Sequence, residues 1–151
     1  MPLHRSRRYW LLVAGVAFWL FLVVGAPLLH QSSPFWSDTL YAGFSRICHQ
    51  QPERSLHLAD EPLAVCSRCC GLYAGLWLGL LAIPYLRRFS TALIDRPRLL
   101  ILFGIPLLID LLSPNTVLSR FLTGGLAAFP VALFVWQAAE QFRPAPARRK
   151  L

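Results

Sequence analysis

Four long apolar runs separated by polar segments make up most of this chain. They cover approximately residues 9–29, 69–86, 98–112 and 117–137, and the first contains no charged residue. A helix needs about 20 predominantly apolar residues to cross a hydrocarbon core roughly 30 Å thick. The pattern therefore predicts an all-α membrane protein, a bundle of four transmembrane helices. A cleavable signal peptide is the alternative for the first run, but that run exceeds the usual apolar core of about 7–15 residues.

The composition agrees with this pattern. Hydrophobic residues make up 56% of the 151 residues and charged residues only 15%, whereas soluble domains usually carry about 25% charged residues. The net charge is +8, but the basic residues form short clusters between the apolar runs instead of one continuous patch. Such clusters are typical of membrane orientation. We therefore expect membrane lipids around the protein and no nucleic-acid partner.

The distribution of lysine and arginine predicts the orientation. With a cytoplasmic N-terminus, eleven of the fifteen basic residues lie on the cytoplasmic side, in residues 1–8, in the loop between the second and third runs, and in residues 139–151. Basic residues are enriched in cytoplasmic loops. We expect a multi-pass protein of the bacterial inner membrane with both termini cytoplasmic. Its single membrane domain would cover residues 9–138, with an outer, periplasmic loop at residues 30–68.

A short amphipathic helix is predicted in the first half of the outer loop. Ser33 suits the N-cap and Pro34 the first helical position. Apolar side chains recur at spacings of three and four residues, and the face that they predict consists of Trp36, Leu40, Phe44 and Ile47. We expect this helix to lie along the membrane surface or to pack over the end of the bundle.

Small residues and prolines mark the predicted spans. In the second run, Gly71, Gly75 and Gly79 recur every four residues along one face. Such a face allows a neighbouring helix to approach closely. Prolines inside or near the ends of the spans predict kinks or contacts with neighbouring helices; they are Pro84, Pro106 and Pro130.

The most distinctive chemistry lies in residues 48–75, which contain all four cysteines and two of the four histidines. Zinc in proteins prefers four cysteine and histidine ligands, and a gap of two residues between cysteines suits one ion. We therefore predict a zinc-like transition-metal site of Cys48, Cys66 and Cys69. The fourth ligand would be His49, His57 or water, and of these we favour His49.

Two alternative roles for the cysteines stay open. A Cys-x-x-Cys pair at a helix N-terminus, next to Arg68, favours thiolate, and the exported compartment is oxidising. Cys66 and Cys69 could therefore serve a membrane thiol–disulfide oxidoreductase linked to quinone, although a dedicated second cysteine pair is missing. Alternatively, one disulfide from Cys48 to Cys66 or Cys69 would join the outer loop to the second span. Whether the protein is an enzyme stays open.

Two ionisable residues stand inside the apolar runs. Asp110 lies near the outer end of the third run, and Arg120 lies near the start of the fourth. Such residues are costly in a membrane and are usually paired, and the SPNT turn at residues 113–116 would bring them together. We predict that they pair and face the bundle interior beneath the cysteine-bearing turn. With Arg54 and Arg68 they would form a polar pocket or support the cysteine site.

Arginines near the cysteines suggest one more possibility. Arg46, Arg54 and Arg68 could bind an anionic group such as a lipid headgroup phosphate. Solubility of the outer loop accounts for the same residues more simply, and we favour it.

The order of these rare residues resembles a bacterial integral-membrane family named domain of unknown function 2085. The shared pattern reads CHQQPERS at residues 48–55 and CSRCCGLYAG at residues 66–75, and it continues to RFLTG at residues 120–124. The resemblance implies that these residues form one unit, but the family has no established activity. Two positions depart from it. Cys70 stands where threonine is more frequent, so we leave it out of the site, and Asp110 is followed by LLSPN instead of Gly-x-x-Gln.

Overall fold

The computed structural model describes residues 7–85, 98, 100–113 and 115–141, and this part of the chain is mostly helical. Most of the basic loop between the second and third apolar runs lies outside the described residues, as does the basic tail from residue 142. The orientation predicted from these basic clusters therefore stays a prediction.

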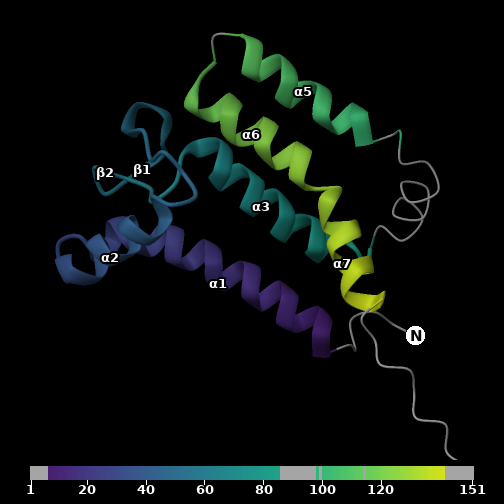
Figure 1. The fold of residues 1–151 in the computed structure, drawn as a ribbon, viewed down its shortest axis with the longest axis horizontal. Coiled ribbons are helices and arrows are strands. Elements are labelled where there is room, and N and C mark those ends of the chain that lie inside the picture. The colour runs from purple at the N-terminus through teal and green to yellow at the C-terminus, as the bar shows by residue number, and fades with distance from the viewer. Residues whose placement is uncertain (1–6, 86–97, 99, 114, 142–151) are drawn as a thin grey trace, which may run out of the picture.

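The helices lie side by side, with a small cap at one end. They are α1 (Arg7–Leu29), α2 (Pro34–Phe44), α3 (Ser67–Ala82), α5 (Leu100–Leu112), α6 (Val117–Ala128) and α7 (Val131–Gln141). Between α2 and α3 lie the 3-10 turn η2 (Pro52–Arg54) and an antiparallel hairpin of β1 (His57–Leu58) and β2 (Glu61–Pro62). In space the order is α1, α3, α6, α5 (Figure 1). The cap of α2 and the hairpin lies at the end where α3 begins, and the start of α1 and the end of α7 lie at the opposite end.

Within the described residues, two helical stretches are long and apolar enough to cross a membrane, Arg7–Leu29 and Val117–Trp136. They correspond to the first and fourth predicted runs. Helices α3 and α5 contain 16 and 13 residues, which extend about 24 and 20 Å at 1.5 Å per residue. Both are shorter than a hydrocarbon core of roughly 30 Å. The count of four transmembrane helices therefore stays a prediction.

The glycines of α3 bring α6 into backbone contact, as predicted. A Cβ atom built on Gly71 would lie 2.1 Å from the carbonyl oxygen of Phe121, and one built on Gly75 would lie 2.1 Å from that of Gly125. Neither position can carry a side chain unless the helices separate. Further along, the chain turns between α6 and α7 at Pro130, where proline lacks the N–H that would continue the helix. The predicted kink at this proline is confirmed.

Helix α2 packs on α1, but only part of its predicted apolar face points inward. Ser37 is fully buried, and its hydroxyl donates a 2.8 Å hydrogen bond to the carbonyl oxygen of Ala26 in α1. Phe44 is also buried, whereas Trp36 and Ile47 are exposed. Phe44 of the predicted face thus packs over the bundle end, and the placement of Trp36 and Ile47 along the membrane surface stays a prediction. The small serine allows α2 to approach α1 closely, which turns the larger tryptophan outward.

The outer loop contains a hairpin that the sequence pattern did not predict. Helix α2 begins as expected, with Ser33 at the N-cap position and Pro34 in the first turn. The two residues of the hairpin turn, Ala59 and Asp60, have φ angles of 53° and 66°. Two-residue hairpin turns favour positive φ at both positions, usually with asparagine, aspartate or glycine. Alanine is uncommon there, which is why residues 57–62 carry no clear turn signal.

Two apolar clusters stabilise this arrangement at opposite ends of the bundle. One joins α1, α3 and α7, and there the hydroxyl of Tyr9 donates a 3.0 Å hydrogen bond to the carbonyl oxygen of Leu80. The other joins α1, α2, the residues before α3, and α3 itself. Cys48 and Cys70 are buried members of this second cluster. The second cluster therefore packs the cysteine-bearing segment against α1 and α2.

Candidate metal centre

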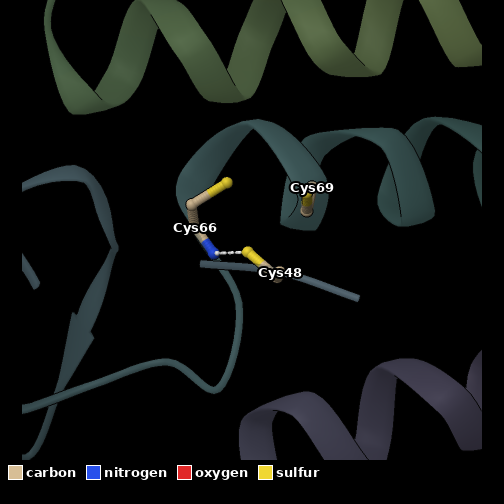
Figure 2. Close-up of side chains that lie close together, drawn as sticks. All are labelled: Cys48, Cys66 and Cys69. Atoms are coloured by element: carbon tan, nitrogen blue, oxygen red, sulfur yellow. Dashed lines mark hydrogen bonds between the residues drawn. The ribbon is translucent and has the colours of Figure 1, made fainter. Parts of the chain in front are cut away.

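Three of the four cysteines come together at the start of α3. The sulfur atoms of Cys48, Cys66 and Cys69 all lie within 4.8 Å of one another. Cys66 occupies the N-cap position of α3 and Cys69 lies in its first turn, while Cys48 follows the end of α2 (Figure 2). All four cysteines are free thiols in the structure. The convergence of the three sulfurs that we predicted from their spacing is therefore present.

Gln50 fixes the position of Cys48, and it was not among the predicted site residues. Its side-chain amide donates two hydrogen bonds of 2.8 Å, to the carbonyl oxygens of Tyr41 and Ala64. The backbone of Gln50 has a φ of 47°, which is uncommon for a residue with a side chain. Gln50 therefore links the end of α2 to the segment that leads into Cys66. Its place in the Cys-His-Gln motif was the available signal.

Further hydrogen bonds attach the outer loop to the start of α3. The hydroxyl of Ser67, which is fully buried, donates a 2.9 Å hydrogen bond to the carbonyl oxygen of Arg54. The hydroxyl of Tyr41 donates to the carbonyl oxygen of Pro62. Burial, together with the nearby carboxylate of Glu61, raises the pKa of Tyr41. These two hydrogen bonds thus attach the outer loop to the start of α3 and to α2.

Hydrogen bonds to sulfur favour the deprotonated form of Cys66, whereas the proton that Cys69 shares with Cys66 raises the pKa of Cys69. The backbone N–H of Cys66 donates to the sulfur of Cys48 over 3.2 Å (Figure 2). The thiol of Cys69 donates to the sulfur of Cys66, and this is the main reason why the pKa of Cys66 is lowered to about 5. The backbone N–H groups of Cys69 and Arg68 and the thiol of Cys48 lower it further, against the effect of burial. A thiolate is the form of cysteine that binds metals and attacks disulfides.

Both histidines of the outer-loop motif, His49 and His57, lie outside this sulfur group, as does the fourth cysteine. His49 is exposed, but it lines the same pocket as the three cysteines. His57 is exposed in β1. Cys70 is 6% exposed and belongs to the apolar cluster beneath the site. The structure therefore brings three cysteines together and leaves the fourth-ligand role of His49 as a prediction.

Asp110 is buried beside the cysteine turn, but its ion partner differs from the predicted one. Its carboxylate lies 2.6 Å from the guanidinium of Arg68, and it accepts a 2.7 Å hydrogen bond from the hydroxyl of Ser119. Asn115 also donates to Asp110. We expected a direct pair with Arg120, and that expectation was wrong. Close packing of α3 on α6 places Arg68 next to the end of α5, so Arg68 reaches the carboxylate instead.

Arg120 contacts Asp110 indirectly, through Asn115. Its Nε donates a 2.5 Å hydrogen bond to the side-chain oxygen of Asn115, and Asn115 in turn contacts Asp110. Arg120 also lines a pocket of about 430 Å³ next to the sulfur cluster. The remaining lining residues are Ile47, Cys48, His49, Gln51, Arg54, Cys66, Arg68, Cys69 and Leu72.

The three sulfurs can provide three ligands for a soft or borderline metal ion. A tetrahedral zinc ion with Zn–S bonds of about 2.3 Å requires sulfurs about 3.8 Å apart. The observed separations, all within 4.8 Å, meet this requirement after side-chain shifts of roughly 1 Å or less. One position of a tetrahedral ion would remain for a further ligand. The same thiols could alternatively be oxidised in pairs.

Comparison with known proteins gives a family but no activity. The family model described as a predicted membrane protein (DUF2085) matches residues 48–134. The uncharacterized protein MJ1492 of Methanocaldococcus jannaschii is 33% identical over 142 residues, which covers 85% of this chain and 91% of that protein. No solved structure matches the chain.

Proposed function

The chain belongs to the family of predicted membrane proteins DUF2085, and from the geometry of its cysteines we propose that it holds one zinc-like transition-metal ion on Cys48, Cys66 and Cys69. The site would lie at the outer face of a four-helix membrane bundle. The observation that carries the proposal is the mutual approach of the three sulfurs, all within 4.8 Å.

The hydrogen bonding around the sulfurs supports a metal over a purely structural disulfide. A disulfide uses two sulfurs and would leave the third cysteine of the cluster without a role. The N–H of Cys66 donates to the sulfur of Cys48, and such a donor stabilises negative charge on the sulfur, as metal binding requires. The fourth ligand would be His49, which lines the same pocket, or a water or substrate group.

Metal content and a matched set of variants test this proposal. Protein purified under reducing conditions without chelators should contain one metal ion per chain by elemental analysis. Cys48→Ser, Cys66→Ser and Cys69→Ser should each lower that content severely, because three ligands leave few to spare. Cys70→Ser is the control, since Cys70 is not part of the group of three sulfurs, and it should keep the wild-type content. Wild-type protein without stoichiometric metal would contradict the proposal.

The proposed membrane arrangement has four spans in one domain of residues 9–138, with both termini in the cytoplasm of a bacterial cell. Two apolar helices of sufficient length support it, as does the exposure of large apolar side chains on the helices, such as Phe21 (68%) and Ile101 (65%). Lipids would cover these side chains. A periplasm-specific reporter inserted at Asp60 should be active, and the same reporter fused after Leu151 should be inactive. The reverse result would overturn the orientation.

Thiol–disulfide exchange is the second candidate, and the lowered pKa of Cys66 favours it. In this reaction the thiols of Cys66 and Cys69 would form one disulfide, and two electrons and two protons would pass to a quinone, which becomes a quinol. Thiol trapping at defined redox potentials distinguishes the candidates. A catalytic pair should change state at a mild potential, whereas a structural disulfide should stay oxidised until the potential falls below about −300 mV. A pair that remains metal-bound throughout would exclude the redox function.

A further inference from the structure

The pocket next to the sulfur cluster is rich in arginine, and the metal proposal does not use this property. Arg54, Arg68 and Arg120 come from three different elements, η2, α3 and α6, and all three line the same pocket of about 430 Å³. Guanidinium groups that face one cavity repel each other unless an anion lies between them. The arrangement therefore calls for a balancing negative charge.

Among the described residues, a carboxylate pairs with only one of the three arginines. Arg68 pairs with Asp110 at 2.6 Å. In the part of the chain that the structure describes, the side chain of Arg54 makes no hydrogen bond or ion pair, and Arg120 uses only its Nε, toward Asn115. The terminal nitrogens of Arg120 and the whole guanidinium of Arg54 remain available to a ligand.

The charge of the pocket is positive with a divalent metal ion bound, and it is also positive without the ion as long as only the Cys66 thiol is ionised. Three thiolates around a divalent ion carry one net negative charge, and three arginines with one aspartate carry two positive charges. Ligands with several oxygen acceptors and a negative charge fit this site, because guanidinium groups bind phosphate oxygens in a bidentate manner. The pocket volume of about 430 Å³ leaves room beyond a single phosphate group. The apolar side chains of Ile47 and Leu72, which also line it, suit an organic substituent.

We propose that this pocket binds a phosphate group through Arg54 and Arg120. The inference goes beyond the metal site and does not rest on it, because the two guanidinium groups are available without a metal. The phosphate could belong to a lipid headgroup or to free phosphate. The chemistry of recognition is the same for both sources, so the experiment has to separate them.

The test measures ligand affinity by isothermal titration with the purified full chain in an uncharged detergent. Inorganic phosphate is one probe, and dihexanoyl phosphatidic acid, a soluble lipid with a phosphate headgroup, is the other. Dihexanoyl glycerol without phosphate and sodium chloride at matched ionic strength are the reference ligands. If both probes bind, the proposal is supported and free phosphate is a sufficient ligand. Binding of the lipid alone supports it with the headgroup as the source.

Arginine variants make the test specific. Arg54→Gln and Arg120→Gln should each weaken binding about tenfold or more, since a hydrogen bond to a charged group contributes roughly 1.5–3 kcal/mol. Arg46→Gln is the matched control, because Arg46 is exposed in the same loop but does not line the pocket; it should change affinity by less than about twofold. Arg54 is exposed, so its replacement should leave folding and metal content intact.

Two results would overturn the proposal. One is a dissociation constant above about 1 mM for both probes, equal to that of the reference ligands. The other is an equal loss of affinity in Arg46→Gln and Arg54→Gln, which would mean that the overall charge of the loop, and not the pocket, attracts phosphate.

Discussion

The guanidinium of Arg68 lies 2.6 Å from the carboxylate of Asp110, and this ion pair joins the turn between Cys66 and Cys69 to the end of α5. Ser119 and Asn115 also donate hydrogen bonds to Asp110. One buried carboxylate therefore connects α5 and α6 to the turn of α3 that carries Cys69.

Removing one member of this pair should harm the protein more than removing both. Arg68→Met leaves the carboxylate of Asp110 buried without its ion partner, and breaking a buried ion pair in this way costs about 3–5 kcal/mol. The double variant with Asp110→Leu should regain much of that loss. Equilibrium unfolding in mixed detergent micelles provides the measurement. Equal stability of wild type, single variants and double variant would show that the pair contributes nothing.

Gly75→Ala should separate α3 from α6. The new methyl group would lie 2.1 Å from the carbonyl oxygen of Gly125, and overpacking of this kind typically costs about 1–3 kcal/mol. Gly15→Ala is the matched control, because nothing lies within 4 Å of a Cβ at Gly15. That control should gain up to about 1 kcal/mol from better helix propensity. Thermal unfolding of both variants checks the contrast, and similar effects at the two glycines would refute close packing of α3 on α6.

Gln50→Gly tests the hydrogen bonds of the Gln50 side chain without straining the backbone at this position. Glycine accepts a φ of 47° without strain, but it loses both bonds to Tyr41 and Ala64. We expect a loss of about 1–3 kcal/mol and faster alkylation of Cys48, which is 6% exposed in the wild type. Gln51→Ala serves as control, because the bond at Gln51 uses its backbone carbonyl. Unchanged alkylation of Cys48 in Gln50→Gly would mean that Gln50 does not hold this cysteine.

Ionisation of Tyr41 should lower the free energy of unfolding at high pH. Its pKa in the folded protein is raised above 10 by burial and by Glu61, so folding favours the protonated form. The stabilisation is complete below the unfolded pKa of about 10 and disappears as the pH rises through the folded pKa. Tyr41→Phe should be less stable near neutral pH by about 1 kcal/mol and should lack this dependence. The free energy of unfolding of wild type and Tyr41→Phe would be measured from about pH 8 to about pH 11 in roughly one-unit steps. Curves that run parallel over this range would contradict the prediction.

Ala59→Gly should stabilise the hairpin. Alanine in the left-handed conformation, here with a φ of 53°, costs roughly 1–2 kcal/mol, a cost that glycine avoids. Part of the gain is lost to the greater freedom of glycine in the unfolded chain. We expect a higher unfolding midpoint for Ala59→Gly, whereas Ala42→Gly in α2 should lower it. A lower midpoint for Ala59→Gly would show that the turn is not strained.

The features that the sequence predicted well depend on local pattern. The apolar run of α1, the glycine face of α3 and the pairing of Cys66 with Cys69 follow from spacing within one helix, and Cys48 was added because the loop returns to the same membrane face. The partner of Asp110 does not, because it depends on how α3 and α5 are rotated about their axes. The role of Gln50 was missed for a similar reason. Its two carbonyl partners come from segments nine residues before and fourteen residues after it, which no local pattern reveals.

The contact between Cys48 and Cys66 also bears on how the protein is assembled. Their sequence separation is 18 residues, and they belong to different halves of the structure. Cys48 follows the α1–α2 unit, whereas Cys66 begins the unit of α3, α5 and α6. During synthesis the first unit emerges well before the glycine face of α3 finds its partner in α6. All three cysteines lie within residues 48–69, so the sulfur cluster can form once the start of α3 has left the ribosome and packs against the α1–α2 unit, before α5 and α6 are made.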